Sequence, residues 1–235
     1  MAKLLSDLFT DINLLLSDTT SGTIDNDDRT VAINLALDYV NGRGAYRFQK
    51  ETTPISFVAD TFVYTPSISS FKAPGYMEVN SLDRYPAFSY VDVEYFRRKR
   101  YRSESRESMF AIEEIGGTFT VYINHFNTET LDLVYYSNFL VLDDDGSTRK
   151  EKFADNNDRL LIPDRHSAIV TMKAAEFLFH TRQSSRKDGM SFTRGEYDTK
   201  LADFDYEYKV SIPKPTRRMR PRISQNVTYR RITRK

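Results

Sequence analysis

The hydrophobic pattern of this chain changes period twice, and that limits the folds open to it. Near the N-terminus, apolar residues recur every three to four positions, as on one face of a helix. From about residue 46 to 140 they alternate with polar residues, as in strands with one buried face. The helical period returns near residue 164. We therefore expect an α+β fold, with an α-helical bundle core, an inserted small antiparallel β-sheet and an extended C-terminal tail.

The pattern predicts a single domain over residues 1–212 and a separate basic extension over residues 213–235. The predicted parts of the domain are helices at about 3–16, 25–42, 164–182 and 196–210, and a β-rich insert at about 46–140. In the second helix, only Asn34, Asp38 and Asn41 interrupt the apolar positions, so we expect this helix to be buried on most sides.

Within the insert, the glycine pair Gly116-Gly117 gives the clearest hairpin signal, between strands at 109–115 and 118–124. Alternation at residues 55–64 predicts a short hairpin, and alternation at 131–135 predicts a third strand that continues the sheet. Ser89 followed three residues later by Asp92 resembles a capping box that opens a short helix.

The charge of the chain is unevenly distributed. Residues 213–235 carry nine basic residues and no acidic one, and removing them from the net charge of +1 leaves −8 on residues 1–212. The chain is therefore an acidic body with a basic tail. With no cysteine, thiolate chemistry and disulfides are excluded. We expect a soluble protein without a signal peptide, since no apolar run approaches the ~20 residues of a membrane span.

Patterns that carry chemistry are weak in this sequence. His125, His166 and His180 lie far apart and belong to no metal-binding motif, so we expect ordinary structural roles for them. The acidic run Asp143, Asp144 and Asp145 precedes Gly146 too closely for an EF-hand loop, and a solvated turn is favoured. We expect no catalytic residue, metal or cofactor.

Two basic clusters are candidates for contact with partners. The first ends the predicted short helix, and it is either a solvated helix end or a contact for an acidic protein surface or phosphate; it comprises Arg97, Arg98, Lys99, Arg100 and Arg102. The second is the tail, which either docks on a partner or merely aids solubility; its candidate residues are Lys214, Arg217, Arg218, Arg220, Arg222, Tyr229, Arg230 and Arg231. In an extended strand, the same face would carry Ile223, Val227 and Tyr229, so the tail could also add as a strand to the sheet edge of a partner.

The order of several short segments resembles that of the head-to-tail adaptor proteins of tailed bacteriophages. The segments are AINLALDYV at 32–40, YRFQKE at 46–51, FVYTP at 62–66, LDLVYY at 131–136, LLIPDRHSA at 160–168 and EYDTKL at 196–201. The resemblance covers about residues 25 to 210. Each segment is short, so the order carries the resemblance more than any one motif does.

The resemblance implies a structural virion protein that connects capsid to tail, is assembled in the host cytoplasm and has no membrane partner. It implies a ring of copies, a dodecamer, under the portal protein, with a tail or neck protein below. It also implies that double-stranded DNA passes through the channel of the ring without sequence-specific binding. The basic tail is then the candidate portal contact, and Asp143 to Asp145 would face the channel or a partner surface. The alternative is a nucleic-acid-binding protein that uses the tail and the Arg97–Arg102 cluster on phosphates.

Overall fold

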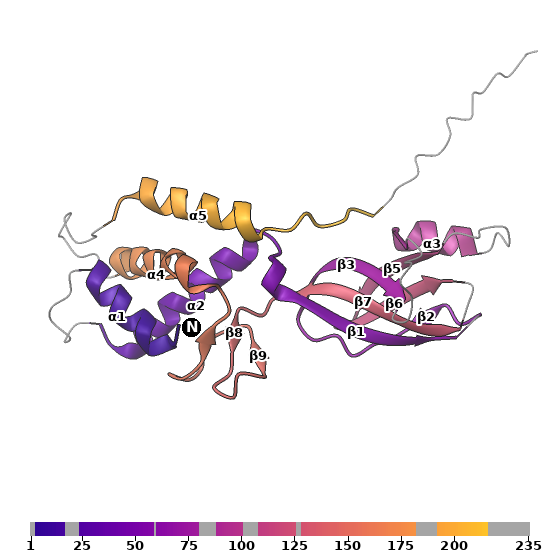
Figure 1. Cartoon of the computed structure of the whole chain (residues 1–235), viewed down its shortest axis with the longest axis horizontal. Helices are drawn as coiled ribbons and strands as arrows, with labels where there is room; N and C mark the ends of the chain where they lie inside the picture. The colour runs from indigo at the N-terminus through magenta and orange to yellow at the C-terminus, as the bar shows by residue number, and fades with distance from the viewer. Residues whose placement is uncertain are drawn as a thin grey trace, which may run out of the picture.

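The computed structural model describes residues 3–16, 24–58, 60–79, 88–100, 108–125, 128–181 and 192–215. The chain forms two lobes side by side, one mainly helical and one mainly of strands (Figure 1). The helices are α1 (Leu5–Leu15), α2 (Asn26–Gly42), α3 (Val93–Arg100), α4 (Ala168–Thr181) and α5 (Arg194–Tyr208), with short 3-10 turns η1 (Arg47–Gln49) and η2 (Asp164–His166).

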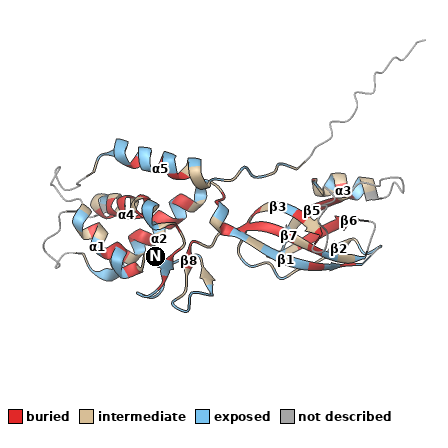
Figure 2. Cartoon of the chain, in the orientation of Figure 1, coloured by how far each residue is buried: buried red, intermediate tan, exposed pale blue. Residues whose placement is uncertain are grey.

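The helical lobe consists of α1, α2, α4 and α5 around one apolar core (Figures 1 and 2). Helix α2 begins where the Asp25 carboxylate accepts the amide of Asp28, 2.7 Å away. Helix α5 begins at a reciprocal cap between Thr193 and Glu196, and this cap starts it two residues before the predicted position. The fully buried side chains at the centre of the core include Leu8, Ile12, Ile33, Leu37, Val40, Ile169, Val170 and Phe204.

A small three-stranded sheet packs within the helical lobe. Its strand order is β10-β8-β9, with β8 (Val141–Leu142), β9 (Arg149–Lys150) and β10 (Arg159–Leu160). The Leu160 amide also donates to the Lys3 carbonyl at 2.9 Å, so this sheet reaches the start of α1.

The second lobe is a sandwich of two sheets. The first has the order β1-β7-β3 and the second β2-β6-β5-β4. The strands are β1 (Lys50–Phe57), β2 (Val63–Tyr64), β3 (Phe71–Val79), β4 (Ser89–Tyr90), β5 (Met109–Ile115), β6 (Thr118–Asn124) and β7 (Glu129–Ser137). The sheets pack face to face through one apolar layer, formed by Ile55, Phe57, Met77, Val79, Phe110, Val121, Ile123, Leu131 and Leu133.

Helix α3 covers the outer face of the second sheet. Phe96 is fully buried there against Met109, Ala111 and Tyr122. Alternate residues of β5 therefore serve different layers: Met109 and Ala111 face α3, whereas Phe110 faces the sandwich interior. No helix in the described ranges is long and apolar enough to cross a membrane.

The predicted fold class is wrong. In the part of the chain that the structure describes, five helices and ten strands in three sheets make a mixed structure, in which the β lobe is as substantial as the helical one, and not a helical bundle core with a small inserted sheet. The sequence pattern located most strands but gave no measure of their mutual packing. Alternation shows that one face of a strand is buried, and here two such faces cover each other and form a second core.

Strand partners also differ from the predictions. The segments expected to form one hairpin, β1 and β2, lie in different sheets, and β7 pairs with β1 and β3 and not with β6. The hairpin of β5 and β6 is present, and Gly116 and Gly117 have the positive φ angles of 59° and 80° that its turn requires. Ser89 belongs to β4, and Asp92 alone caps α3 by accepting the Tyr95 amide.

A polar network joins the two lobes. The Gln49 amide group donates to the Asn41 side chain at 2.8 Å, and Asn41 donates to Asn138 at 3.2 Å. The Lys72 ammonium donates to the side-chain oxygens of both Asn41 and Gln49. Among the ion pairs of the described residues, none includes Lys72, so its charge is met by neutral acceptors only.

This environment makes stability depend on pH. Burial, followed by charge repulsion from Lys209, lowers the pKa of the Lys72 ammonium from its ordinary value near 10.5 to about 8. Below pH 8 both the folded and the unfolded chain hold the proton, and the full cost of the buried charge is present. As the pH rises from 8 toward 10.5, the folded chain loses the proton first, and this cost is removed.

We expect the free energy of unfolding of the wild-type chain to gain about 1–2 kcal/mol from this group between pH 8 and 9.5. Lys72→Met should lack this gain and be no less stable at pH 7, because Asn41 and Gln49 keep other donors, Gln49 Nε2 and the Tyr46 amide. Urea unfolding at several pH values measures the gain in the wild-type chain and the stability of the variant at pH 7. An unchanged pH dependence in the variant contradicts the assignment.

Candidate functional site

The basic cluster predicted to contact partners lies on α3, at the β lobe. Arg97 pairs with Glu113 at 2.8 Å and donates to the Tyr122 hydroxyl at 2.9 Å, and this hydroxyl donates to the same carboxylate. Arg98 pairs with Glu94 one turn earlier, at 3.1 Å. Arg97 therefore fastens α3 to β5 and β6, whereas the pair of Arg98 and Glu94 lies within α3.

The rest of this cluster is less engaged. The Lys99 ammonium lies 5.9 Å from the centre of the Tyr95 ring. Arg100 ends α3, and its side chain lies outside the described part of the molecule, as does the whole of Arg102. The described arginines thus favour the interpretation of a solvated helix end over that of a phosphate-binding surface.

The predicted tail contact lies mostly outside the described residues. Lys214 is described and exposed, on an extended segment that leaves the end of α5 and passes toward the β lobe (Figure 1). The remaining predicted residues of the tail lie beyond residue 215 and outside the described ranges; they are Arg217, Arg218, Arg220, Arg222, Tyr229, Arg230 and Arg231.

The acidic run is the turn between β8 and β9. The Asp145 carboxylate accepts the amides of Ser147 and Thr148, and these hydrogen bonds lower its pKa to about 2. Gly146 completes the turn with a φ of 69°. Asp144 is exposed, whereas Asp143 turns toward Lys150. The three carboxylates therefore have three different surroundings and do not form one site.

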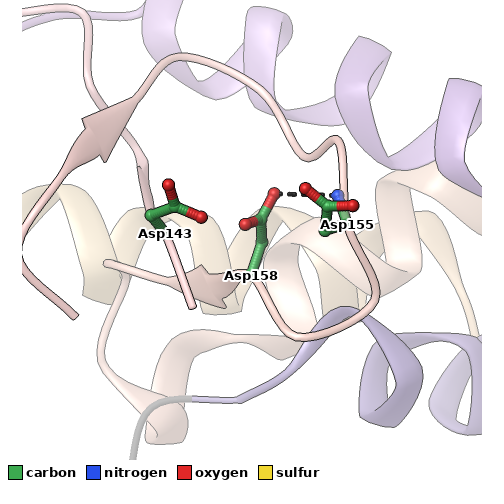
Figure 3. Close-up of side chains that lie close together, drawn as sticks. All are labelled: Asp143, Asp155 and Asp158. Carbon is green, nitrogen blue, oxygen red and sulfur yellow. Dashed lines mark hydrogen bonds between the residues drawn. The ribbon is translucent and has the colours of Figure 1, made fainter. Parts of the chain in front are cut away.

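Asp143 belongs to a cluster with Asp155 and Asp158 that sequence spacing did not suggest (Figure 3). The Lys150 ammonium bonds Asp143 at 2.9 Å and Asp158 at 3.1 Å, and lies 3.8 Å from Asp155. A cation of the protein itself therefore stands among the carboxylates. The hydrogen bonds that Lys150 donates to Asp143 and then to Asp158 raise the pKa of its ammonium, so it stays charged.

Asp158 is fully buried and orders the loop before β10. Its second oxygen accepts the amide of Ala154 at 2.8 Å. The same oxygen accepts the amide of Asp155 at 3.0 Å (Figure 3). Burial raises the pKa of Asp158, but these amides and Lys150 outweigh burial, and the pKa is lowered overall. The cluster thus supports the small sheet, with Lys150 balancing part of its negative charge.

The histidines do not meet at one place in the structure. Each nitrogen of His125 has a partner, Ser108 at 2.9 Å on Nδ1 and Glu129 on Nε2, and the ring is packed against Phe57 and Phe88. His166 bonds Glu207 at 2.7 Å and so ties the start of α4 to the end of α5. Both histidines thus have structural roles, as the sequence predicts.

Sequence reasoning missed an exposed apolar stripe on α2. Val31 is 59% exposed, Leu35 46% and Tyr39 38%, and their spacing of four places them along one face of the helix. The prediction that α2 is buried on most sides is therefore wrong. The helix packs through the opposite face, which carries Ala32, Ile33, Ala36, Leu37 and Val40. A contiguous exposed apolar face of this kind is typical of a contact surface.

No protein-family profile matches this chain, and no curated protein matches it either.

The role of Lys150 can be tested by Lys150→Met. This change removes the cation that balances the buried Asp158, so the thermal midpoint should fall by several degrees. The matched control is Lys152→Met, whose ammonium pairs with Asp38 at the surface and whose loss should have little effect. For the wild-type chain, calcium chloride should leave the midpoint unchanged. A calcium-dependent rise would instead favour a metal site at these carboxylates.

Proposed function

We propose that this protein is a head-to-tail adaptor of a tailed bacteriophage, a structural protein that forms a ring under the portal vertex and joins capsid to tail. The observation that carries the proposal is the apolar stripe of Val31, Leu35 and Tyr39. Apolar area exposed on a regular helix gains free energy when a protein surface covers it, roughly 25 cal/mol per Å² buried. A protein that functions by assembly requires such a surface.

The distribution of charge supports the same proposal. In the described residues, the prominent charged clusters are tied to partners within the chain: Arg97 to Glu113, Arg98 to Glu94, and Lys150 to its aspartates. Charges already paired in this way contribute little to a catalytic or phosphate site. The order of the adaptor-like segments along the chain supports the proposal independently, from the sequence.

The stripe predicts self-association that a single charge should weaken. Leu35→Asp places a carboxylate in the centre of the stripe, and the dissociation constant for self-association should rise at least tenfold, since burying an unpaired charge costs several kcal/mol. Ile115→Asp is the control, because Ile115 is also exposed, at 55%, but lies on the β lobe. Sedimentation velocity over a range of concentrations measures the effect. Equal self-association of both variants and the wild-type chain would contradict the role of the stripe.

The basic tail predicts binding to the portal. The full-length chain should co-sediment saturably with a portal ring from the same virus, and a chain truncated after Ile212 should bind it more weakly, because nine cations are lost. Binding to duplex DNA, measured in parallel over a range of salt concentrations, tests the alternative. Absent portal binding together with tight, salt-sensitive DNA binding would replace the adaptor proposal with that of a nucleic-acid-binding protein.

A further inference from the structure

A groove opens on the helical lobe between α1, α4 and the start of α5. Its volume is about 380 Å³, and its apolar lining consists of Leu14, Leu15, Ala168, Met172 and Phe192. Leu14, on the rim, is 72% exposed. The polar lining includes Asp11, which pairs with Lys3, and Glu196, which caps α5. These two acids are thus already engaged, and the groove is chiefly an apolar site.

The groove and the stripe lie on different surfaces of the same lobe. Among the described residues that line the groove, none belongs to α2. On α5, Glu196 and Lys200 line the groove, whereas Tyr197 lies about 100° further around the helix and is buried. On that other side, the Lys173 ammonium lies 4.4 Å from the centre of the Tyr39 ring, at the end of the stripe, and 5.8 Å from that of Tyr197. The stripe therefore approaches α5 near Tyr197, whereas the groove contacts α5 through Glu196 and Lys200.

The charges at the two surfaces are complementary. At about 100° per residue, Asp27 falls beside Val31 on the exposed arc of α2, whereas Asp38, on the same arc, is already paired with Lys152. Lys200 stands at the groove, and no ion pair of the described residues includes it. An acidic apolar ridge and an apolar groove with a lysine on its rim are thus both present on one chain.

We propose that the groove between α1, α4 and α5 receives the Val31–Leu35–Tyr39 stripe of a second copy of this chain. This inference rests on the proposed assembly function and specifies its contact. Val31 and Leu35 lie about 6 Å apart along α2, and they enter the groove against Leu14 and Met172, while Asp27 approaches Lys200. Each copy inserts its stripe into the groove of one neighbour and receives the stripe of the other, so the contact is heterologous. Such a contact closes into a ring when a whole number of the rotations between neighbours makes a full turn.

The chain contains no cysteine, so engineered cysteines report the contact without background. The variant with both Leu14→Cys and Leu35→Cys should give a ladder of covalent oligomers on a non-reducing gel, after mild oxidation or treatment with a short bismaleimide. Each single variant alone should remain monomeric on the gel. A mixture of the two single variants should give covalent dimers only. The control pairs Leu14→Cys with Ile115→Cys on the β lobe, and it should give no ladder.

The outcomes separate this contact from assembly in general. Covalent dimers from Leu35→Cys alone would show that two stripes pack against each other, and would overturn the ridge-and-groove contact. Self-association in sedimentation without a ladder from either reagent would place the contact elsewhere and leave the assembly proposal standing. The last outcome is that the double variant and the wild-type chain both stay monomeric, on the gel and in sedimentation, even with the portal ring present. This result would overturn both the contact and the assembly proposal.

Discussion

The two lobes depend on the buried side chain of Tyr46. Its hydroxyl donates to the Val40 carbonyl at 3.2 Å and to the Asp205 carboxylate at 3.1 Å, and its ring packs on Phe48 and Phe204. One residue therefore joins the end of α2, the entry to the β lobe and α5. Burial, followed by the charge of Asp205, raises the pKa of Tyr46, so the hydroxyl stays protonated and continues to donate. The positions of both lobes rest on this contact and on the network around Gln49.

The parts of the fold that could be predicted from sequence are those set by neighbours along the chain. Helical periodicity and capping residues placed α1, α2, α4 and α5 near their observed ranges, and Gly116-Gly117 located the hairpin of β5 and β6. Strand partners could not be predicted in this way. The pairing of β1 with β7 joins residues about 80 positions apart, and alternation reveals a buried face without showing what covers it.

The same limit applies to the candidate contacts. The apolar residues on both sides of α2 look alike in the sequence, and only the position of α4 determines that Ala36 is buried and Leu35 is exposed. Conversely, the clusters of charge were the strongest sequence signals, yet in the described residues most of them hold the fold together. Arg97 and Lys150 meet their carboxylate partners through tertiary packing. The spacing of residues along the chain did not indicate that Asp155 and Asp158 would lie beside Lys150.

The chain enters the β lobe at Lys50 and leaves it at Tyr136, and these two residues face each other as partners in adjacent strands. An insertion whose ends already touch can be lengthened, shortened or exchanged without moving the elements that flank it. Evolution can therefore alter the reach of the sandwich while the helical lobe keeps its surfaces. In a protein built in this way, the length of the sandwich and the surface of the helical lobe can change as two separate variables.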